Sequence, residues 1–421
     1  MPTTHHEPAA GEVRGWLARS ALPLHSLDAG TSTTDLQPLK SVLDGVRIVG
    51  LGEATHGTSE FFRLKHRLLE FLVTELGFSV LAMEASASAA PAVDAYVRHG
   101  VGDGAKALAG LGFWTWRTRE VLAVIEWMRA YNRGRSEAHK VRFAGVDPQQ
   151  CGGSLAVLDA SLQRLGAARV TAYLSPLRVL ARAQPGSRPD PEQRLVHDAE
   201  RLLDFLVANA PGEADALRHA RILRHAADVV TLPRWHREGR RTASAARDRY
   251  MADAVSGLLA DPSARVALWA HNGHITAAPS GRTAPALGGH LRARHGGAYY
   301  ALGLLFGRGS FRAGRIWPGP WARPRPRAVA SHRTGPARAA ALETQLAAAH
   351  PGDHLVDLRR TADAPPAVRQ WLHDPHPTRT FGALVPRWTY RFHLTPVVLA
   401  EAYDGLAYVA VSSSSRPYEA P

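Results

Sequence analysis

The sequence contains one cysteine, very little lysine and no long apolar run. Cys151 has no second cysteine to pair with, so an intrachain disulfide cannot form and a secreted disulfide scaffold is excluded. No run of about 18 apolar residues occurs, so no transmembrane helix is expected. Residues 1–30 also lack the uninterrupted hydrophobic stretch of a signal peptide. These absences predict a cytoplasmic protein without a membrane partner.

The net charge is the unusual feature of the composition. The proportions of hydrophobic residues, 45%, and of charged residues, 21%, are ordinary, but the formal net charge is +14. Such a charge raises the possibility of nucleic-acid binding. However, the lysines are only Lys40, Lys65, Lys106 and Lys140, and every other basic residue is arginine. Arginine used together with much alanine, glycine and proline is typical of GC-rich coding sequence, and no nucleic-acid-binding motif is present. We therefore expect a small-molecule substrate and no nucleic-acid partner, with the oligomeric state left open.

Short apolar runs alternate with helical patterns in the first third of the chain, which is typical of parallel βα units. Strands are expected at residues 46–51, 79–83, 141–146 and 265–270. A helix is expected from Thr58 to Leu76, because its apolar residues recur at helical spacing and Gly77 follows its end. Between the third and fourth strands only helical patterns occur.

These patterns predict an α/β fold with a mostly parallel central sheet, flanking helices and a helical insertion. Residues 1–154 are expected to form the N-terminal part of the α/β core, residues 155–262 the helical insertion, and residues 263–421 the part that completes the core. Residues 314–336 are rich in arginine and proline, and we expect them to form a loop or a mobile flap.

Ionisable residues follow all four predicted strands. Parallel strands place their carboxyl ends at one edge of a sheet, so side chains that follow these strands should meet in one crevice. Polar residues after a strand are also common as helix caps, but four in register favour a shared catalytic site. In chain order, these residues are Glu53, His56, Glu84, Asp147, His271, Asn272 and His274.

The residue types suit hydrolysis. Histidine has the side-chain pKa closest to neutrality, so His56 or His271 could take a proton from water. Glu53 could hold the imidazole in one tautomer and stabilise the imidazolium, and Glu84 could do the same or act as a second acid or base. For the oxyanion, the candidates are the second histidine, Asn272 and the backbone N–H groups at the start of the helix from residue 58.

Other chemistries fit the sequence less well. A serine hydrolase needs a Gly-x-Ser-x-Gly motif, which is absent. A metal hydrolase stays an alternative because the same side chains can bind zinc or manganese, although the His-Glu-x-x-His motif is absent. The pair Glu53 and Glu84 could serve a glycosidase, but that leaves the histidines without a role. We expect no metal and no other cofactor.

Several segments carry a resemblance to a known family. Residues 50–62, 81–84 and 269–274 match its motifs, and weaker matches occur at 145–149, 247–252, 302–311 and 403–405. Together these segments resemble the erythromycin esterase family over most of the chain. The resemblance implies an α/β fold with a helical insertion, and hydrolysis of a macrolide lactone, without a metal, by water that a histidine activates.

Carried over to this sequence, the resemblance makes His56 the general base and Glu53 and Glu84 essential acids. His271 and His274 match the paired histidines that line the family's cleft. We therefore predict an ester hydrolase acting on a macrolide lactone or a related secondary metabolite, in antibiotic resistance or in biosynthesis. The alternative is acyl transfer, lactone formation or dehydration at the same site, acting on a natural-product intermediate.

Four further residues are candidates for substrate binding. Members of the family often have arginine at the position of Lys65, so a substrate contact there would lack the bidentate guanidinium geometry. Asp147 precedes a proline and could either serve the site or form a turn. Trp114 and Trp116 lie before a predicted helix and could either wall the cleft or belong to the core.

Overall fold

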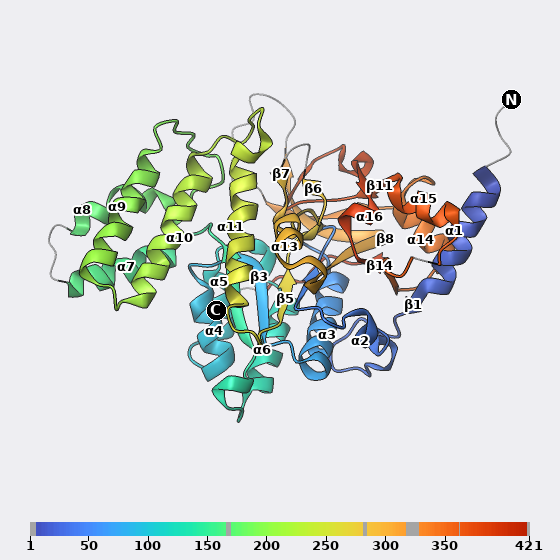
Figure 1. The fold of residues 1–421 in the computed structure, drawn as a ribbon, viewed down its shortest axis with the longest axis horizontal. Helices are drawn as coiled ribbons and strands as arrows, with labels where there is room; N and C mark the ends of the chain where they lie inside the picture. Colours follow the sequence, from blue (N-terminus) through green and yellow to red (C-terminus); the bar gives the residue numbers. More distant parts are fainter. Residues whose placement is uncertain (1–5, 166–169, 281–283, 317–327, 362, 419–421) are drawn as a thin grey trace.

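The computed structural model describes residues 6–165, 170–280, 284–316, 328–361 and 363–418, and it is centred on one large sheet (Figure 1). The sheet has ten strands in the order β1-β10-β14-β8-β2-β5-β3-β4, and β9 and β12 pair with β8. The strands from β14 to β4 run parallel, whereas β10 is antiparallel to β14 and β1 is antiparallel to β10. The predicted α/β fold with a mostly parallel sheet is confirmed.

The parallel part of the sheet contains the four strands that the sequence predicted, and two more. The predicted strands are β2 (Ile48–Leu51), β3 (Val80–Ser86), β4 (Arg142–Asp147) and β5 (Val266–Trp269), and the additional ones are β8 (Tyr299–Ile316) and β14 (Gly405–Ser412). The other strands of this sheet are β1 (Ala21–Pro23), β9 (Val329–Thr334), β10 (His354–Asp357) and β12 (Leu384–Pro386). Two small separate sheets are formed by β6 (Pro279–Ser280) with β7 (Ala284–Pro285), and by β11 (Pro375–Arg379) with β13 (Leu394–Val398).

Helices cover both faces of the sheet, which explains why its central strands are apolar along their whole length. In β2, Val49 and Leu51 pack into one core and Ile48 into another. The larger core includes α3 (Ser59–Leu76), α4 (Ala90–His99), α5 (Gly104–Gly110) and α6 (Arg119–Asn132). The smaller core lies under α11 (Ala243–Leu258), α12 (Asn272–Ile275) and α13 (Leu287–His295). Of these helices, α11 and α13 are labelled in front of the sheet in Figure 1.

Further helices extend the larger core toward the right-hand end of Figure 1. These are α1 (His6–Ser20), α2 (Leu39–Val42), α14 (Leu342–Ala349), α15 (Pro366–His373) and α16 (Leu399–Ala402). The helix α3 ends as its sequence predicts, because Gly77 adopts a left-handed backbone with φ 69° and its N–H caps the carbonyl of Leu72. None of the helices in the described part of the chain is long and apolar enough to cross a membrane.

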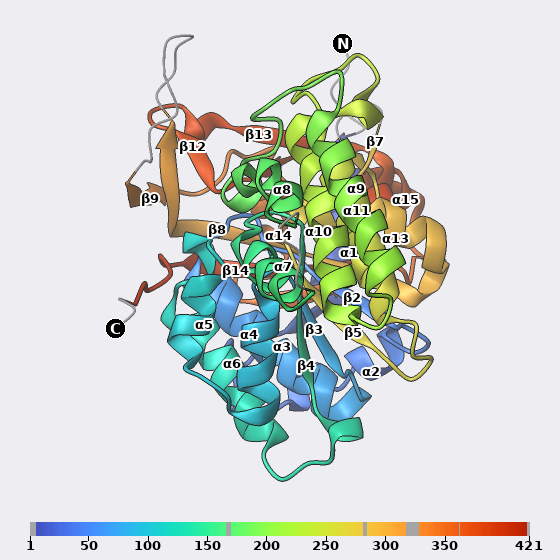
Figure 2. The same ribbon diagram turned by 90° about the vertical axis from the view of Figure 1, so that its left-hand side faces the viewer.

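A group of helices with its own core lies at the left of Figure 1 and faces the viewer in Figure 2. It consists of α7 (Gly152–Arg164), α8 (Val170–Leu174), α9 (Arg194–Asn209) and α10 (Ala214–Thr231). Cys151 belongs to this core, where burial raises the pKa of its thiol to about 12, so the thiol is unreactive. The helix α11 packs instead against the sheet through Met251 and Val255. The division of the chain at residues 154 and 262 stays a prediction.

The prediction of a loop at residues 314–336 is wrong at both ends of that segment. Residues 314–316 are the last of β8, and residues 329–334 form β9. The two strands pair antiparallel, from Gly309 opposite Thr334 to Gly314 opposite Val329. Residues 317–327 lie outside the described part of the chain. The arginine and proline content hid the strands, because alternate residues of this hairpin face solvent and need not be apolar.

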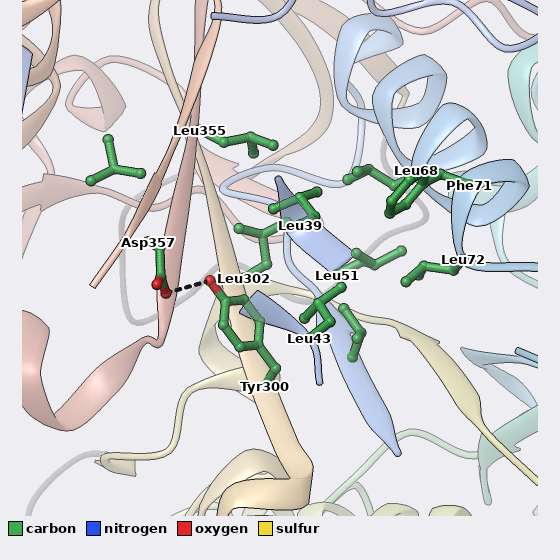
Figure 3. Close-up of a pocket in the computed structure, with 12 residues that line it drawn as sticks. Leu39, Leu43, Leu51, Leu68, Phe71, Leu72, Tyr300, Leu302, Leu355 and Asp357 are labelled. Atoms are coloured by element: carbon green, nitrogen blue, oxygen red, sulfur yellow. Dashed lines mark hydrogen bonds between the residues drawn. The ribbon is translucent and has the colours of Figure 1, made fainter. Parts of the chain in front are cut away.

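A small cavity lies between α3 and the sheet (Figure 3). Its volume is about 20 Å³ and its lining is almost entirely apolar, with Leu51, Leu68 and Leu302 among the side chains. Asp357 lies at its edge and accepts a hydrogen bond of 3.1 Å from the Tyr300 hydroxyl. A space of this size holds about one water at most, so it is a gap in core packing and not a ligand site.

Candidate active site

The carboxyl ends of β2, β5, β3 and β4 lie next to one another, and the ionisable residues predicted to follow these strands meet there. They form two linked groups. One group is built on the loop after β2, and the other joins the ends of β3 and β4 to the helix α11. His271, after β5, lies between them, with its ring centroid 4.8 Å from that of His56 and its backbone N–H bonded to Glu84.

His56 is hydrogen-bonded to Glu53, which forms a buried ion pair with Lys65. Its Nδ1 lies 2.7 Å from Oε1 of Glu53, and Oε2 of Glu53 accepts hydrogen bonds from Lys65 Nζ at 2.7 Å and from the indole of Trp269 at 3.1 Å. Because a carboxylate can only accept, Nδ1 of His56 carries the proton and Nε2 is left with a lone pair. No protein partner for this Nε2 occurs among the described residues, and the side chain is 12% exposed.

The charge of Glu53 is stabilised although the side chain is fully buried. Burial alone would raise its pKa, but Lys65 and His56 outweigh that effect and hold the pKa below its usual value. Burial also lowers the pKa of Lys65 to about 8, against the opposing effect of Glu53. Both groups are therefore mainly charged at neutral pH. Lys65 also lies 4.6 Å from the centre of the Trp269 ring, a further favourable contact for a cation.

Two glycines allow the loop after β2 to adopt this arrangement. A Cβ on Gly52 would lie 2.1 Å from the side-chain oxygen of Asn272. A Cβ on Gly57 would lie 2.1 Å from the backbone oxygen of Arg312 on β8. Any side chain at either position would displace backbone or a buried amide, so the glycines let the His56 loop approach its neighbours closely.

His271 is neutral with a defined tautomer. Burial lowers its pKa, and a protonated His56 ring would lower it further, to about 3, although Glu84 and Glu53 oppose this. Its Nδ1 accepts a hydrogen bond from the N–H of Gly273 at 3.1 Å, so the proton is on Nε2. That Nε2 lies 3.3 Å from the carbonyl oxygen of Phe381, a long hydrogen bond. His271 thus offers a weakly engaged N–H close to His56.

Glu84 is fixed by a second ionic network. One oxygen accepts a hydrogen bond from Arg247 Nη2 at 2.6 Å, and the other accepts the backbone N–H of His271 at 3.0 Å. Arg247 also donates to Asp147 at 2.7 Å. Burial would raise the pKa of Glu84, but His274 and Arg247 hold it well below its usual value. Glu84 is therefore a permanent carboxylate that orients the loop after β5.

His274 completes this second network. Its Nδ1 lies 2.5 Å from a carboxylate oxygen of Asp248, and its Nε2 lies 3.3 Å from Glu84 Oε1 and 2.9 Å from Arg247 Nη1. Burial and the Arg247 charge lower its pKa, but Glu84 and Asp248 outweigh them and raise it to about 10. At neutral pH the ring is therefore cationic, with Nδ1–H donating to Asp248 and Nε2–H directed to Glu84. Arg247 Nη1 can only donate, so it is a close and repulsive neighbour of Nε2 and not its hydrogen-bond partner. With both ring nitrogens protonated, His274 is a poor base.

Comparison with known proteins identifies the family. The family model described as Erythromycin esterase matches residues 73–412. The chain belongs to the erythromycin esterase family. The erythromycin esterase type II of Escherichia coli is 30% identical over 139 residues, which are 33% of this chain and 32% of that enzyme, so the match spans about a third of the relative.

Solved structures support the fold of this erythromycin esterase family member. A crystal structure described as a succinoglycan biosynthesis protein has a TM-score of 0.79 at 22% identity and covers 99% of this chain and 100% of its own. An erythromycin esterase mutant, EreC, in its open conformation has a TM-score of 0.68 at 21% identity and covers 93% of this chain and 97% of its own. At these identities the likeness concerns the fold alone.

Two of the residues predicted to bind substrate, Lys65 and Asp147, are fully buried and paired with other residues of the chain. Lys65 is fully buried beneath Glu53 and Asp147 is fully buried beneath Arg247. Asp147 also accepts from the backbone and side chain of Gln149, so it forms the turn after β4 as well as an ion pair. Neither the ammonium of Lys65 nor the carboxylate of Asp147 is exposed to solvent, and each pairs with an ionic partner of the chain.

Asn272 and the first backbone amide of α3, both candidates for binding an oxyanion, are hydrogen-bonded to other parts of the chain. The Asn272 side chain donates to the carbonyl of Leu304 at 2.9 Å and accepts from its N–H at 3.1 Å, which joins the loop after β5 to β8. The first helical amide, that of Ser59, donates to the carbonyl of Ser413 at 2.9 Å. The Asn272 amide and the Ser59 N–H are therefore both occupied by protein acceptors in this structure.

The two tryptophans differ in position. Trp116 is buried and its ring is perpendicular to that of His56, with 6.4 Å between centroids. It also contacts the Trp269 ring at 6.3 Å and so forms a rigid wall behind His56. Trp114 is only partly buried, and the guanidinium of Arg312 lies 5.4 Å from its ring centre.

Sequence reasoning missed Arg247 and Asp248 as members of the site. Both lie on α11, far along the chain from the strand ends, and only the tertiary structure brings them to Glu84 and His274. The matching segment at 247–252 was the available signal, since it places adjacent basic and acidic residues on a helix. Among the described residues, no group of three or more His, Cys, Asp or Glu side chains is arranged to hold a metal ion.

Proposed function

We propose that this member of the erythromycin esterase family hydrolyses an ester, a macrolide lactone or a related cyclic ester, with water that His56 activates. The observation that carries the proposal is the geometry of His56. Its Nδ1 proton is bonded at 2.7 Å to a buried, charged Glu53, and its Nε2 lone pair has no protein partner within the described residues. This is the arrangement of a general base with its orienting acid.

In the first step, His56 Nε2 takes a proton from water while the water oxygen bonds to the ester carbon. Glu53 stabilises the imidazolium, as the aspartate of a catalytic triad does. Lys65 keeps Glu53 ionised and so acts through it as a positioning residue. A positioned base of this kind contributes about a hundred- to ten-thousand-fold in rate.

We assign stabilisation of the oxyanion to His271. The ring is neutral at neutral pH, and its one proton is on Nε2 because Nδ1 accepts the N–H of Gly273. The hydrogen bond from this Nε2–H to the carbonyl of Phe381 is long, at 3.3 Å. A developing alkoxide is a stronger acceptor than an amide carbonyl, so this N–H can bind it preferentially in the transition state. Glu84 holds the backbone of His271 in place at 3.0 Å.

In the second step, the carbon–oxygen bond of the ester breaks and the leaving alkoxide takes the proton from the His56 imidazolium. The products are an alcohol and a carboxylic acid, which releases its proton to solvent at neutral pH, and one water is consumed. A glycosidase mechanism is disfavoured because it needs one protonated carboxylic acid, whereas the pKa values of both Glu53 and Glu84 are held below their usual range.

The substrate class comes from the relatives and remains part of the proposal. The type II relative in Escherichia coli is described as an erythromycin esterase, which supports a macrolide lactone. The structure described as a succinoglycan biosynthesis protein shares the fold, so the fold by itself does not specify that substrate.

The test is turnover of a panel of macrolide lactones by the wild type, His56→Ala and Glu84→Gln, with the exposed His99→Ala as a control. We expect His56→Ala to lower kcat by at least about a hundredfold and His99→Ala to leave it within twofold. Activity of His56→Ala within a few-fold of wild type contradicts the assignment. A product that has lost water, or that joins two fragments, contradicts hydrolysis and points to the non-hydrolytic alternative.

A further inference from the structure

Arg312 on β8 lies beside the His56 loop without taking part in either ionic network. Its backbone N–H donates to the carbonyl of Gly57, the residue after His56, at 3.0 Å. The two backbones are so close that only glycine fits at position 57. On the other side, the guanidinium of Arg312 lies 5.4 Å from the ring centre of Trp114. Arg312 thus has a fixed position at the border of the site.

The guanidinium of Arg312 is partly buried and has no carboxylate partner among the described residues. Its Nη1 is inaccessible to solvent and makes no hydrogen bond with them. Glu120 is the carboxylate that interacts electrostatically with Arg312, but it already accepts hydrogen bonds from the Ser59 hydroxyl at 2.7 Å and from Arg416 at 3.1 Å. Burying an unpaired guanidinium N–H is costly, so such a group is normally paired in the functional state.

Other unsatisfied polar atoms lie at the same junction. The backbone of residue 58 pairs with that of residue 414, and the N–H of Ser415 donates to the carbonyl of Gly57 at 2.9 Å. In this junction, the side-chain oxygens of Thr58 and Ser415 are also buried without a partner among the described residues. Together with Nη1 of Arg312, these hydroxyls leave hydrogen-bonding capacity unused beside the His56 loop.

We infer that Arg312 and Trp114 form an anion-binding subsite next to the catalytic histidine, which takes a carboxylate group of the substrate. A guanidinium is suited to a carboxylate because its N–H groups match the two oxygens, and the Trp114 ring orients it. The location of this subsite relative to the reacting ester rests on the proposed function, but the binding of an anion does not. The subsite would select esters that carry an acidic group.

Binding can be tested without turnover. Phenylacetate and its neutral analogue phenylacetamide are titrated by calorimetry, at low salt, into the wild type, Arg312→Gln and Arg308→Gln. Arg308 lies on the same strand and is exposed, so the control removes the same charge outside the subsite. Because hydrogen bonds to a charged group are strong, we expect the wild type and Arg308→Gln to prefer phenylacetate by about tenfold, and Arg312→Gln to lose the preference.

The inference is overturned if the wild type binds neither compound, if it binds both equally, or if Arg312→Gln keeps the preference. Arg312→Lys is a second variant that retains the charge, and we expect it to keep part of the preference for phenylacetate. This variant tests the inference if Arg312→Gln alters the fold. The same titration on His56→Ala should still show the preference. Loss of turnover in that variant tests the proposed hydrolysis separately, so failure of one proposal is distinguishable from failure of the other.

Discussion

Replacing Lys65 by methionine should destabilise the protein strongly, because it would leave Glu53 buried without its cation. The two charges are 2.7 Å apart and both side chains are fully buried. Removing one partner of a buried ion pair costs about 3–5 kcal/mol, since the remaining charge keeps its desolvation penalty. The double variant Lys65→Met with Glu53→Gln removes both charges and keeps an acceptor for His56, so it should recover to within about 1 kcal/mol of the wild type.

The assay is urea unfolding followed by tryptophan fluorescence for the wild type, both single variants and the double variant. Lys40→Met is a matched control because Lys40 also lies 2.7 Å from a glutamate, Glu75, but the two side chains are 43% and 34% exposed. An exposed pair contributes less than about 1 kcal/mol. The reasoning is refuted if Lys65→Met costs no more than Lys40→Met, or if the double variant is no more stable than Lys65→Met.

Two further predictions concern pH and metal. His274 has its pKa raised from 6.5 to about 10, so its contribution to stability is complete below pH 6.5 and is lost as the pH rises toward 10. The difference in melting temperature between the wild type and His274→Gln should therefore be larger at pH 6 than at pH 9.5. An equal difference at both pH values would contradict a charged His274 in the folded protein. Turnover should be unchanged after dialysis against a chelator, whereas a loss that zinc or manganese restores contradicts the metal-free mechanism.

The strands β2, β3 and β5 could be predicted from sequence because each is buried on both faces and is a short apolar run. The helix α3 was predictable for the same local reason, with its apolar stripe and the glycine at its end. The strands β1 and β10 were missed because neither has the apolar run of β2 or β5. The strand β1 has three residues and ends in Pro23, and β10 begins with His354 and ends with Asp357. The hairpin of β8 and β9 was missed because it is polar along part of its length.

The site was predictable where the chemistry follows a strand end, as with His56, Glu84 and His271. It was not predictable where a side chain's role depends on contacts between distant segments. In the sequence, Asn272 is a candidate catalytic donor, yet in the structure both its amide nitrogen and its amide oxygen are hydrogen-bonded to the backbone of β8. Arg247 looks like an ordinary helical arginine until the fold brings it to Glu84, which is 163 positions away in the chain. Sequence order carries no information on such pairings.

The central claim is that water activated by His56 opens an ester. It is tested most directly by incubating the enzyme with a macrolide lactone in water enriched in heavy oxygen and measuring the mass of the product. The account predicts a product that has gained one water, with the heavy oxygen in its new carboxylate, and no such product from His56→Ala. A product that has gained no water, or equal labelling by the wild type and His56→Ala, would contradict it.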